Sequence, residues 1–197
     1  QLFSITGKND RNIDFKSYDE LWKAWETALK FYSDLAVDCD LVCDRSLKHF
    51  DADAFASATI NCSLERGKTL KNGGAEYDYV SQSNIGPSVV GDSLAAVKKL
   101  VFDDKVITMK QLRDAMDTNF EGIEGAKIRK LCRQAPKFGN DIDYVDNIVA
   151  DVYESYLALL PNYHTDRYRC GPKGCGYTMS TSNITSYVPN GFDVGAT

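Results

Sequence analysis

The six cysteines and two histidines are the side chains of this 197-residue sequence best suited to bind a metal ion. Cys170 and Cys175 lie in the glycine-rich stretch RCGPKGCG, and cysteine thiolates are strong zinc ligands. A tetrahedral site needs two further ligands, yet Cys39 and Cys43 are four residues apart in a helical stretch, unlike the knuckle of a zinc loop. We therefore predict that no metal is bound, and that the cysteines are reduced thiols rather than a disulfide framework.

The other polar motifs have structural explanations that we favour over catalytic ones. His49 and His164 belong to no recognisable hydrolytic triad, so we expect them at the surface or near helix ends. The stretch GGAEYDY lacks the Lys-Ser/Thr pair of a phosphate-binding loop. Asp143 and Asp146 stand at a predicted helix start, where carboxylates interact favourably with the helix dipole, and the twelve-residue pattern of a calcium loop is absent.

A polar strand near the end of the sequence is the most informative feature. The stretch MSTSNITSYV alternates in the manner of a strand and carries hydroxyl groups on both faces. One face holds Ser180, Ser182, Ile184 and Ser186, and the other holds Thr181, Asn183, Thr185 and Tyr187. Buried hydroxyls need hydrogen-bond partners, which a polar ligand or a packed loop could supply. An edge strand facing water explains the same pattern equally well, and the residues alone leave both explanations open.

Helical periodicity dominates the rest of the sequence, which must position this strand. Ser17 and Glu20 fit a capping box at the first helix, as do Thr108 and Gln111 at a later one. The spacing of apolar residues predicts helices over residues 17–36, 41–50, 53–64, 92–102, 110–120, 124–134 and 141–160. A short strand is expected at residues 77–80. So many helices would need more strands to cover, so we expect a piece of a larger α/β fold.

The composition excludes several classes of protein. Hydrophobic residues make up 43% and charged residues 26%, and the net charge is −5. A negative balance argues against a nucleic-acid partner, which would require a basic surface to neutralise phosphates. The sequence has neither an apolar run long enough to span a membrane nor a signal peptide, so we expect a cytoplasmic protein. A first residue of Gln rather than Met suggests a piece of a longer chain.

Four blocks of sequence, in this order, resemble the glycyl radical enzymes of the pyruvate formate-lyase superfamily. They are NCSLERGKTLKNGGAEYDYV, GDSLAAVKKLVFDDKVITMKQLRDAMDTNFEG, APKFGNDIDYVDNIV and TSNITSYVPNGFDVGAT. The resemblance covers nearly the whole chain from about Phe15, and it is nearest to the branch of glycerol/diol dehydratases, choline lyases and arylacetate decarboxylases.

The resemblance implies a fold and a chemistry. Family members fold as a ten-stranded α/β barrel of two five-stranded halves, and residues 1–197 would form an internal segment of the second half, without a separate domain. A radical SAM activating enzyme installs a glycyl radical, which passes to a cysteine in a Gly-Cys-x-Glu context. The resulting thiyl radical abstracts hydrogen from the substrate. A homodimer is expected for the full-length protein.

This sequence departs from the family pattern at both radical residues. No cysteine occurs in a Gly-Cys-x-Glu context, and the Arg-Val-x-Gly-Tyr motif of the radical glycine is absent. The resemblance therefore implies that both residues lie outside the chain, which we predict to be inactive alone. It also implies that the strand TSNITSYV lines the substrate pocket. Alternation makes Ser182 and Ile184 the pocket-facing residues, or Asn183 and Tyr187 if the register differs by one.

We expect the full-length protein to eliminate water from a small hydroxylated substrate. The stretches CSLERGK and GGAEYDYV look closest to the diol-dehydratase group. Decarboxylation of an arylacetate and cleavage of a C–N bond, as in choline lyase, remain alternatives. A non-catalytic, stand-alone helical scaffold is the alternative from a different class of protein.

Overall fold

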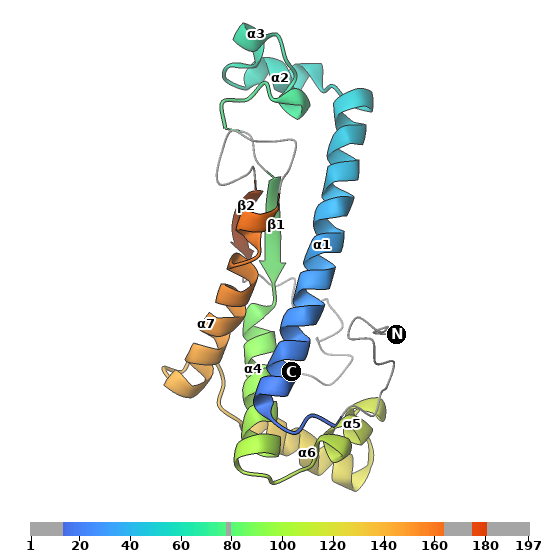
Figure 1. The fold of residues 1–197 in the computed structure, drawn as a ribbon, viewed down its shortest axis with the longest axis vertical. Coiled ribbons are helices and arrows are strands. Elements are labelled where there is room, and N and C mark those ends of the chain that lie inside the picture. The colour runs from blue at the N-terminus through green and yellow to red at the C-terminus, as the bar shows by residue number, and fades with distance from the viewer. Residues whose placement is uncertain (1–13, 78–79, 164–174, 181–197) are drawn as a thin grey trace. The chain divides into compact units, whose positions relative to one another are not determined.

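The computed structural model describes residues 14–77, 80–163 and 175–180. These residues are mostly helical, with two short strands (Figure 1). The chain divides into two compact units. The described part of the first unit comprises residues 14–28, 85–155 and 180, and that of the second comprises residues 29–77, 80–84, 156–163 and 175–179. No described helix combines the length and apolar character needed to cross a membrane.

The longest element is a single helix, α1, from Tyr18 to Phe50. The predicted start is confirmed, because the hydroxyl of Ser17 accepts a hydrogen bond from the Glu20 amide at 3.3 Å. The predicted division into two helices near residues 37–40 is wrong. That stretch, VDCD, contains neither Gly nor Pro, so nothing in its backbone chemistry ends the helix.

The first unit is built on α4 (Pro87–Val97) and α7 (Asp143–Leu157), with the beginning of α1 against them. Pro87 occupies the first helical turn of α4, a position where its fixed φ is favourable and its missing N–H costs nothing. The helix therefore begins five residues before the predicted start at 92. The buried core consists of Leu94, Ala95, Val145, Ile148, Val149 and Val152, so the helix predicted from apolar spacing over 141–160 does bury one face.

A π-helix, η2 (Lys98–Asp103), follows α4 directly and leads to a second core of the first unit. Its wider turn is visible in the bond from the Asp104 amide to the Lys99 carbonyl, at 2.8 Å. The second core joins η2 to α5 (Met109–Asp117) and α6 (Gly122–Gln134). Its buried residues are Leu100, Ile107, Leu112, Ala115 and Ile128.

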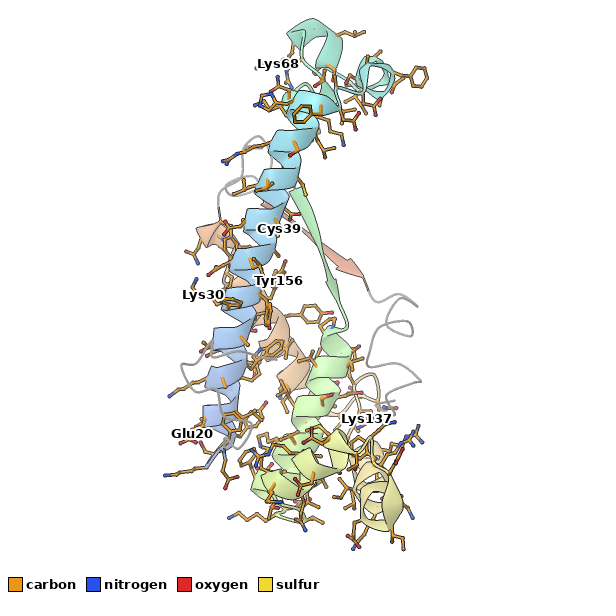
Figure 2. All side chains as sticks on the ribbon, turned by 90° about the vertical axis from the view of Figure 1, so that its right-hand side faces the viewer. Glu20, Lys30, Cys39, Lys68, Lys137 and Tyr156 are labelled. Carbon is orange, nitrogen blue, oxygen red and sulfur yellow. The ribbon has the colours of Figure 1, made fainter. Side chains whose placement is uncertain are left out.

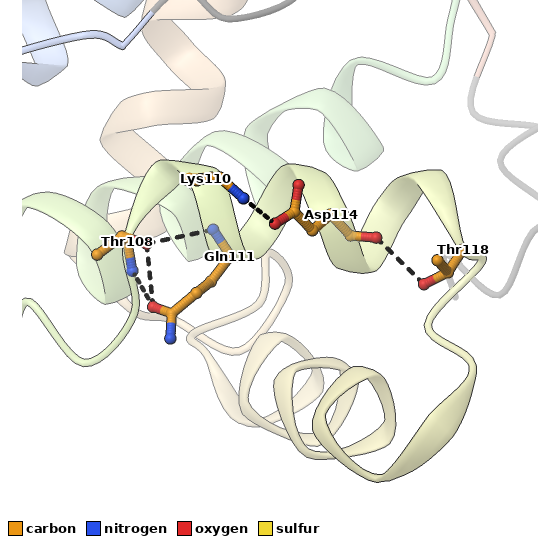
Figure 3. Close-up of polar contacts among 5 residues, drawn as sticks. All are labelled: Thr108, Lys110, Gln111, Asp114 and Thr118. Atoms are coloured by element: carbon orange, nitrogen blue, oxygen red, sulfur yellow. Dashed lines mark hydrogen bonds and ion pairs between the residues drawn. The ribbon is translucent and has the colours of Figure 1, made fainter.

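The predicted capping box at the start of α5 is confirmed (Figure 3). The Gln111 amide donates to the Thr108 hydroxyl at 3.2 Å, and the Thr108 amide donates to the Gln111 side chain at 2.8 Å. Lys110 and Asp114 form an ion pair one turn apart at 2.6 Å, and the Thr118 hydroxyl donates to the Asp114 carbonyl. Local side-chain chemistry thus sets both ends of α5.

In the second unit, the chain that follows α1 forms only short helices. The predicted helix over 53–64 is replaced by two short helices, α2 (Ala54–Thr59) and α3 (Ser63–Arg66). The chain turns between them because Ile60 is extended and Cys62 has a φ of 71°, in the left-handed region. The same unit contains two single turns of 3-10 helix, η1 (Leu70–Asn72) and η3 (Leu160–Asn162).

Strands β1 (Val80–Ile85) and β2 (Cys175–Ser180) form a two-stranded sheet, side by side in Figure 1. The strand predicted at 77–80 therefore begins at the end of that range, and Tyr77 precedes it. Cys175, near the end of the glycine-rich stretch RCGPKGCG, begins β2. The rest of that stretch lies outside the described residues.

Candidate functional site

The predicted pocket residues, Ser182 and Ile184, lie outside the described residues, and so do the alternatives Asn183 and Tyr187. The last described residue before them is Ser180, which ends β2. What the structure provides is therefore the framework that leads to the candidate site: the strand β2, its partner β1, and the elements that hold β1.

Strand β1 passes into the first unit through a single glycine. Gly86 has a φ of 81°, a conformation that a residue with a Cβ adopts at a cost, and Pro87 begins α4 immediately afterwards. Gly86 and Pro87 are both buried. The sequence Gly-Pro thus converts a strand into a helix within one residue, and it fixes where the strand ends.

The loop that precedes β1 is held by Arg66. Its Nη1 donates to the backbone carbonyls of Gly74 at 3.0 Å and Ala75 at 2.5 Å. Gly74 itself has no room for a side chain, because a Cβ there would lie 2.3 Å from the Lys68 carbonyl oxygen. The Ser57 hydroxyl accepts from the Leu70 amide at 3.0 Å, which ties η1 to α2. Gly74 and Ala75 of the GGAEYD block are therefore held in an anchored turn.

A side chain of α4 ties the APKFGND loop to the first unit. The Asp92 carboxylate accepts a hydrogen bond from the Phe138 amide at 2.8 Å, across 46 residues of sequence. Burial raises the pKa of Asp92, and the bond from Phe138 and the charge of Lys137 offset part of that effect. Lys137 in turn donates to the Cys132 carbonyl at 2.9 Å, which closes the end of α6. Two of the blocks on which the family resemblance rests thus meet at one hydrogen bond.

A cluster of aromatic and charged side chains joins α1, η2 and α7. Lys98 Nζ lies 2.8 Å from an Asp103 oxygen and 4.9 Å from the centre of the Tyr144 ring. The Tyr144 hydroxyl donates to the same Asp103 oxygen at 2.9 Å. The bond to Lys98 is the main reason that the pKa of Asp103 lies below its usual range. Burial raises the pKa of Tyr18 to about 12.

These groups serve as fixed donors and acceptors. Burial, with the bond to Asp103, also raises the pKa of Tyr144, so neither tyrosine supplies a phenolate near neutral pH. Sequence reasoning missed this cluster, because its members are separated by up to 126 positions and each one has an ordinary role in its own helix. The acids Asp143 and Asp146 do occupy the first turn of α7, as predicted.

The structure describes four thiols, those of Cys39, Cys43, Cys62 and Cys132, and all four are free. Cys39 and Cys43 are exposed on α1, and Figure 2 labels Cys39 on that helix. Burial raises the pKa of Cys132, which disfavours the nucleophilic thiolate. Among the residues described, no three His, Cys, Asp or Glu side chains gather as a metal site would require. His49 is exposed in the last turn of α1, and His164 lies outside the described residues.

Comparisons with known proteins agree on one family. Its model, described as pyruvate formate lyase-like, matches residues 2–191. The chain is 40% identical over 185 residues to the probable dehydratase YbiW of Escherichia coli (strain K12), covering 93% of this chain and 23% of that protein. It is 34% identical over 186 residues to trans-4-hydroxy-L-proline dehydratase of Clostridioides difficile, covering 93% of this chain and 22% of that protein.

A solved structure supports the same relationship. The glycerol-bound, B12-independent glycerol dehydratase from Clostridium butyricum superimposes with a TM-score of 0.73 at 30% identity, over 89% of this chain and 23% of that one. The chain thus spans less than a quarter of the length of these relatives. The match of the family model over nearly all of the sequence shows that the chain belongs to the pyruvate formate lyase-like family.

Proposed function

We propose that this chain is part of a glycyl radical dehydratase that eliminates water from a small hydroxylated substrate. The observation that carries the proposal is the 40% identity to a probable dehydratase over 93% of the chain. The likeness to a glycerol dehydratase structure, at a TM-score of 0.73, supports the same substrate class. A diol or a triol is therefore the first substrate to test.

The chain itself contains neither of the two motifs that carry the radical. None of its six cysteines stands in a Gly-Cys-x-Glu context, and no Arg-Val-x-Gly-Tyr motif occurs. We place both radical residues elsewhere in the full-length protein. When present there, the glycyl radical supplies the one-electron chemistry, and residues 1–197 contribute a wall of the pocket as an internal segment of a ten-stranded barrel. By itself the chain is inactive.

In this proposal the work of the chain is to position one strand. Ser182 and Ile184 face the substrate, with Asn183 and Tyr187 on the opposite face. The hydrogen bonds that support the proposal lie in the framework: Arg66 to Gly74 and Ala75 before β1, and Asp92 to Phe138 beside α4. A fixed wall matters because reactive intermediates require a closed site from which water is excluded.

The proposed partners follow from the family. A radical SAM activating enzyme generates the radical, and the full-length protein is a homodimer in the cytoplasm. The negative net charge of the chain, −5, is consistent with a small-molecule substrate rather than a nucleic acid.

The first experiment tests the radical. The full-length protein is incubated anaerobically with its activating enzyme, S-adenosylmethionine and a reductant, and electron paramagnetic resonance spectra are recorded. We expect a doublet signal, followed by the loss of water from glycerol or 1,2-propanediol. Absence of the doublet under conditions that activate a known relative would overturn the proposal. A doublet with carbon dioxide from an arylacetate, or trimethylamine from choline, would keep the family but replace the dehydratase reaction.

The second experiment tests the pocket wall. Ser182→Leu fills the pocket and should impair turnover more than folding, whereas Asn183→Leu is the matched control on the opposite face. Both variants are compared by turnover and by circular dichroism. If Asn183→Leu is the variant that loses turnover, the register is shifted by one residue. If Ser182→Leu unfolds the protein while its residual specific activity is unchanged, Ser182 does not line the pocket.

A further inference from the structure

We propose that an exposed apolar seam on α1 binds a helix that another part of the full-length polypeptide contributes. The seam lies in the second unit and consists of Tyr32, Leu35, Cys39 and Val42, which are all exposed. Along the sequence, its members are three, four and three residues apart. This alternation is the spacing at which two α-helices pack side by side. The proposal rests on the family to which the chain belongs, and not on the dehydratase reaction.

The opposite side of this part of α1 is already packed within the second unit. Ser33 and Val37 are only 7% and 5% exposed. The Tyr163 hydroxyl donates to the Asp34 carboxylate at 2.8 Å and so ties the chain after η3 to α1. A helix at a protein surface normally carries polar residues on the side away from its core. A second apolar side on α1 therefore indicates a second packing partner.

The residues beside the seam are apolar as well. The rings of Phe31 and Tyr32 meet edge to face with centroids 5.3 Å apart, and each residue is 47% exposed. Ala36 and Cys43 extend the apolar face on its other side, and Asp38 is its one charged residue. Charged residues commonly flank the seam between separate helices, where they select the partner. A helix of the same polypeptide needs no such selection, which fits their near absence here.

The length of the relatives points to the same occupant. The chain covers 23% of one dehydratase and 22% of another, so more than three quarters of such a polypeptide lies outside the matched region. Within the described part of the second unit, the buried hydrophobic residues are Val37 and Tyr156. A unit that buries so little apolar surface needs further packing partners.

A second copy of the chain is a less suitable occupant. Antiparallel pairing of two α1 helices about the middle of the seam would bring the Asp38 carboxylates of the two copies together. Like charges in an interface oppose association.

Thiol labelling of the full-length protein tests whether the seam is covered. It is carried out before activation, so its result does not depend on the radical or on the reaction. Cys39 and Cys43 are exposed in this structure and would react rapidly if nothing packed against them. We expect a maleimide to modify them roughly 100-fold more slowly in the native protein than in the unfolded protein, because the reaction then requires local opening.

Lys48→Cys supplies a matched thiol on the same helix. Position 48 is exposed and follows Cys39 by about two and a half turns, so it lies on the side of α1 away from the seam. Labelling there should be nearly as fast as in the unfolded protein. If Cys39 and Cys43 react as fast as Lys48→Cys, the seam is open in the full-length protein and the proposal is overturned.

A photochemical cross-link identifies what covers the seam. p-Benzoylphenylalanine replaces Val42 in the full-length protein, and mass spectrometry maps the product. We expect a cross-link within one polypeptide, to a residue outside residues 1–197. A product of twice the mass would assign the seam to a second copy, and a cross-link to another position within residues 1–197 would assign it to the chain itself. Either result would overturn the proposal.

Leu35→Ala tests the packing of the seam without adding a charge. It should speed the labelling of Cys39 by about tenfold or more, since it removes a packed side chain, and leave the oligomeric state unchanged by light scattering. Unchanged labelling of Cys39 would show that Leu35 is not packed, and loss of the dimer would show that the seam binds a second copy. Both outcomes contradict the proposal.

Discussion

The contact between Gly91 and Val149 gives the sharpest prediction about the framework. Gly91 lies in α4, and a Cβ built on it would stand 2.2 Å from Cγ2 of Val149 in α7. Val149 is 2% exposed, and its β-branched side chain has essentially one rotamer in a helix, so it cannot turn away. The substitution Gly91→Ala should therefore push α4 and α7 apart.

The expected cost is the difference between two effects. Overpacking a core costs about 1–3 kcal/mol, and a contact this short belongs at the upper end of that range. Replacing Gly by Ala inside a helix contributes about 1 kcal/mol in the opposite direction. We expect Gly91→Ala to destabilise the pairing of the two helices by about 2 kcal/mol. This corresponds to a roughly 30-fold loss of the protection of their backbone amides against hydrogen exchange.

A double-mutant cycle with Val149→Ala isolates the clash. Without Cγ2, the new methyl at position 91 meets nothing nearer than Val149 Cα and Cβ, both at 3.3 Å, and the helix-propensity gain of about 1 kcal/mol remains. Gly91→Ala should then be neutral or stabilising, so the sign of its effect reverses between the two backgrounds.

Amide hydrogen exchange in the full-length protein is the suitable assay, because it reports the local opening of α4 and α7. Ser93→Ala, on the exposed side of α4, is the matched control and should leave protection nearly unchanged. If Gly91→Ala costs the same with Val149 as with Ala at position 149, the two helices are not held at the distance that the structure gives, and the reasoning is refuted.

Four further predictions concern three side chains of the framework. Burial raises the pKa of Asp92 in the folded state. The protonated carboxyl therefore contributes to stability at a pH below the pKa of the unfolded state, and this contribution is lost as the pH rises through the folded-state pKa. Asp92→Asn should remove this pH dependence of local hydrogen exchange. Asp92→Ala, which removes the acceptor of the solvent-exposed Phe138 amide, should cost about 0.5–1.5 kcal/mol at neutral pH by the same assay. Thr108→Ala should destabilise the start of α5 by about 1 kcal/mol, with faster exchange confined to its first turn. Arg66→Met should expose the turn at Gly74 to limited proteolysis, and unchanged cleavage would show that the two carbonyl contacts do not hold the turn.

Features set by neighbouring residues were predictable from the sequence. The capping box of Thr108 and Gln111 involves two residues three positions apart, so the pattern of side chains contains all the information needed. The apolar stripe of α7 is likewise complete within one helix. The absence of a break in α1 could also have been foreseen, since polarity alone does not end a helix that lacks Gly and Pro.

Features that depend on distant residues were not predictable. The interruption between α2 and α3 is accompanied by a bond from the Leu70 amide to the Ser57 hydroxyl, thirteen positions away, which no local periodicity reports. The Arg66 contacts and the cluster around Lys98 depend in the same way on how segments are brought together. The candidate pocket residues, Ser182 and Ile184, remain predictions, because they lie outside the described residues.

The π-helix η2 has a consequence for how chains of this kind can change in length. A π-turn holds one residue more than the α-helical turn that it replaces, and each residue of an α-helix rotates the following side chains by about 100°. Deleting one residue within Lys98–Asp103 would therefore convert the π-turn into an α-helical turn, and the residues that follow it would keep nearly the same direction. A relative that lacks this residue would need no compensating insertion before Thr108, so a length difference of one residue should be tolerated here.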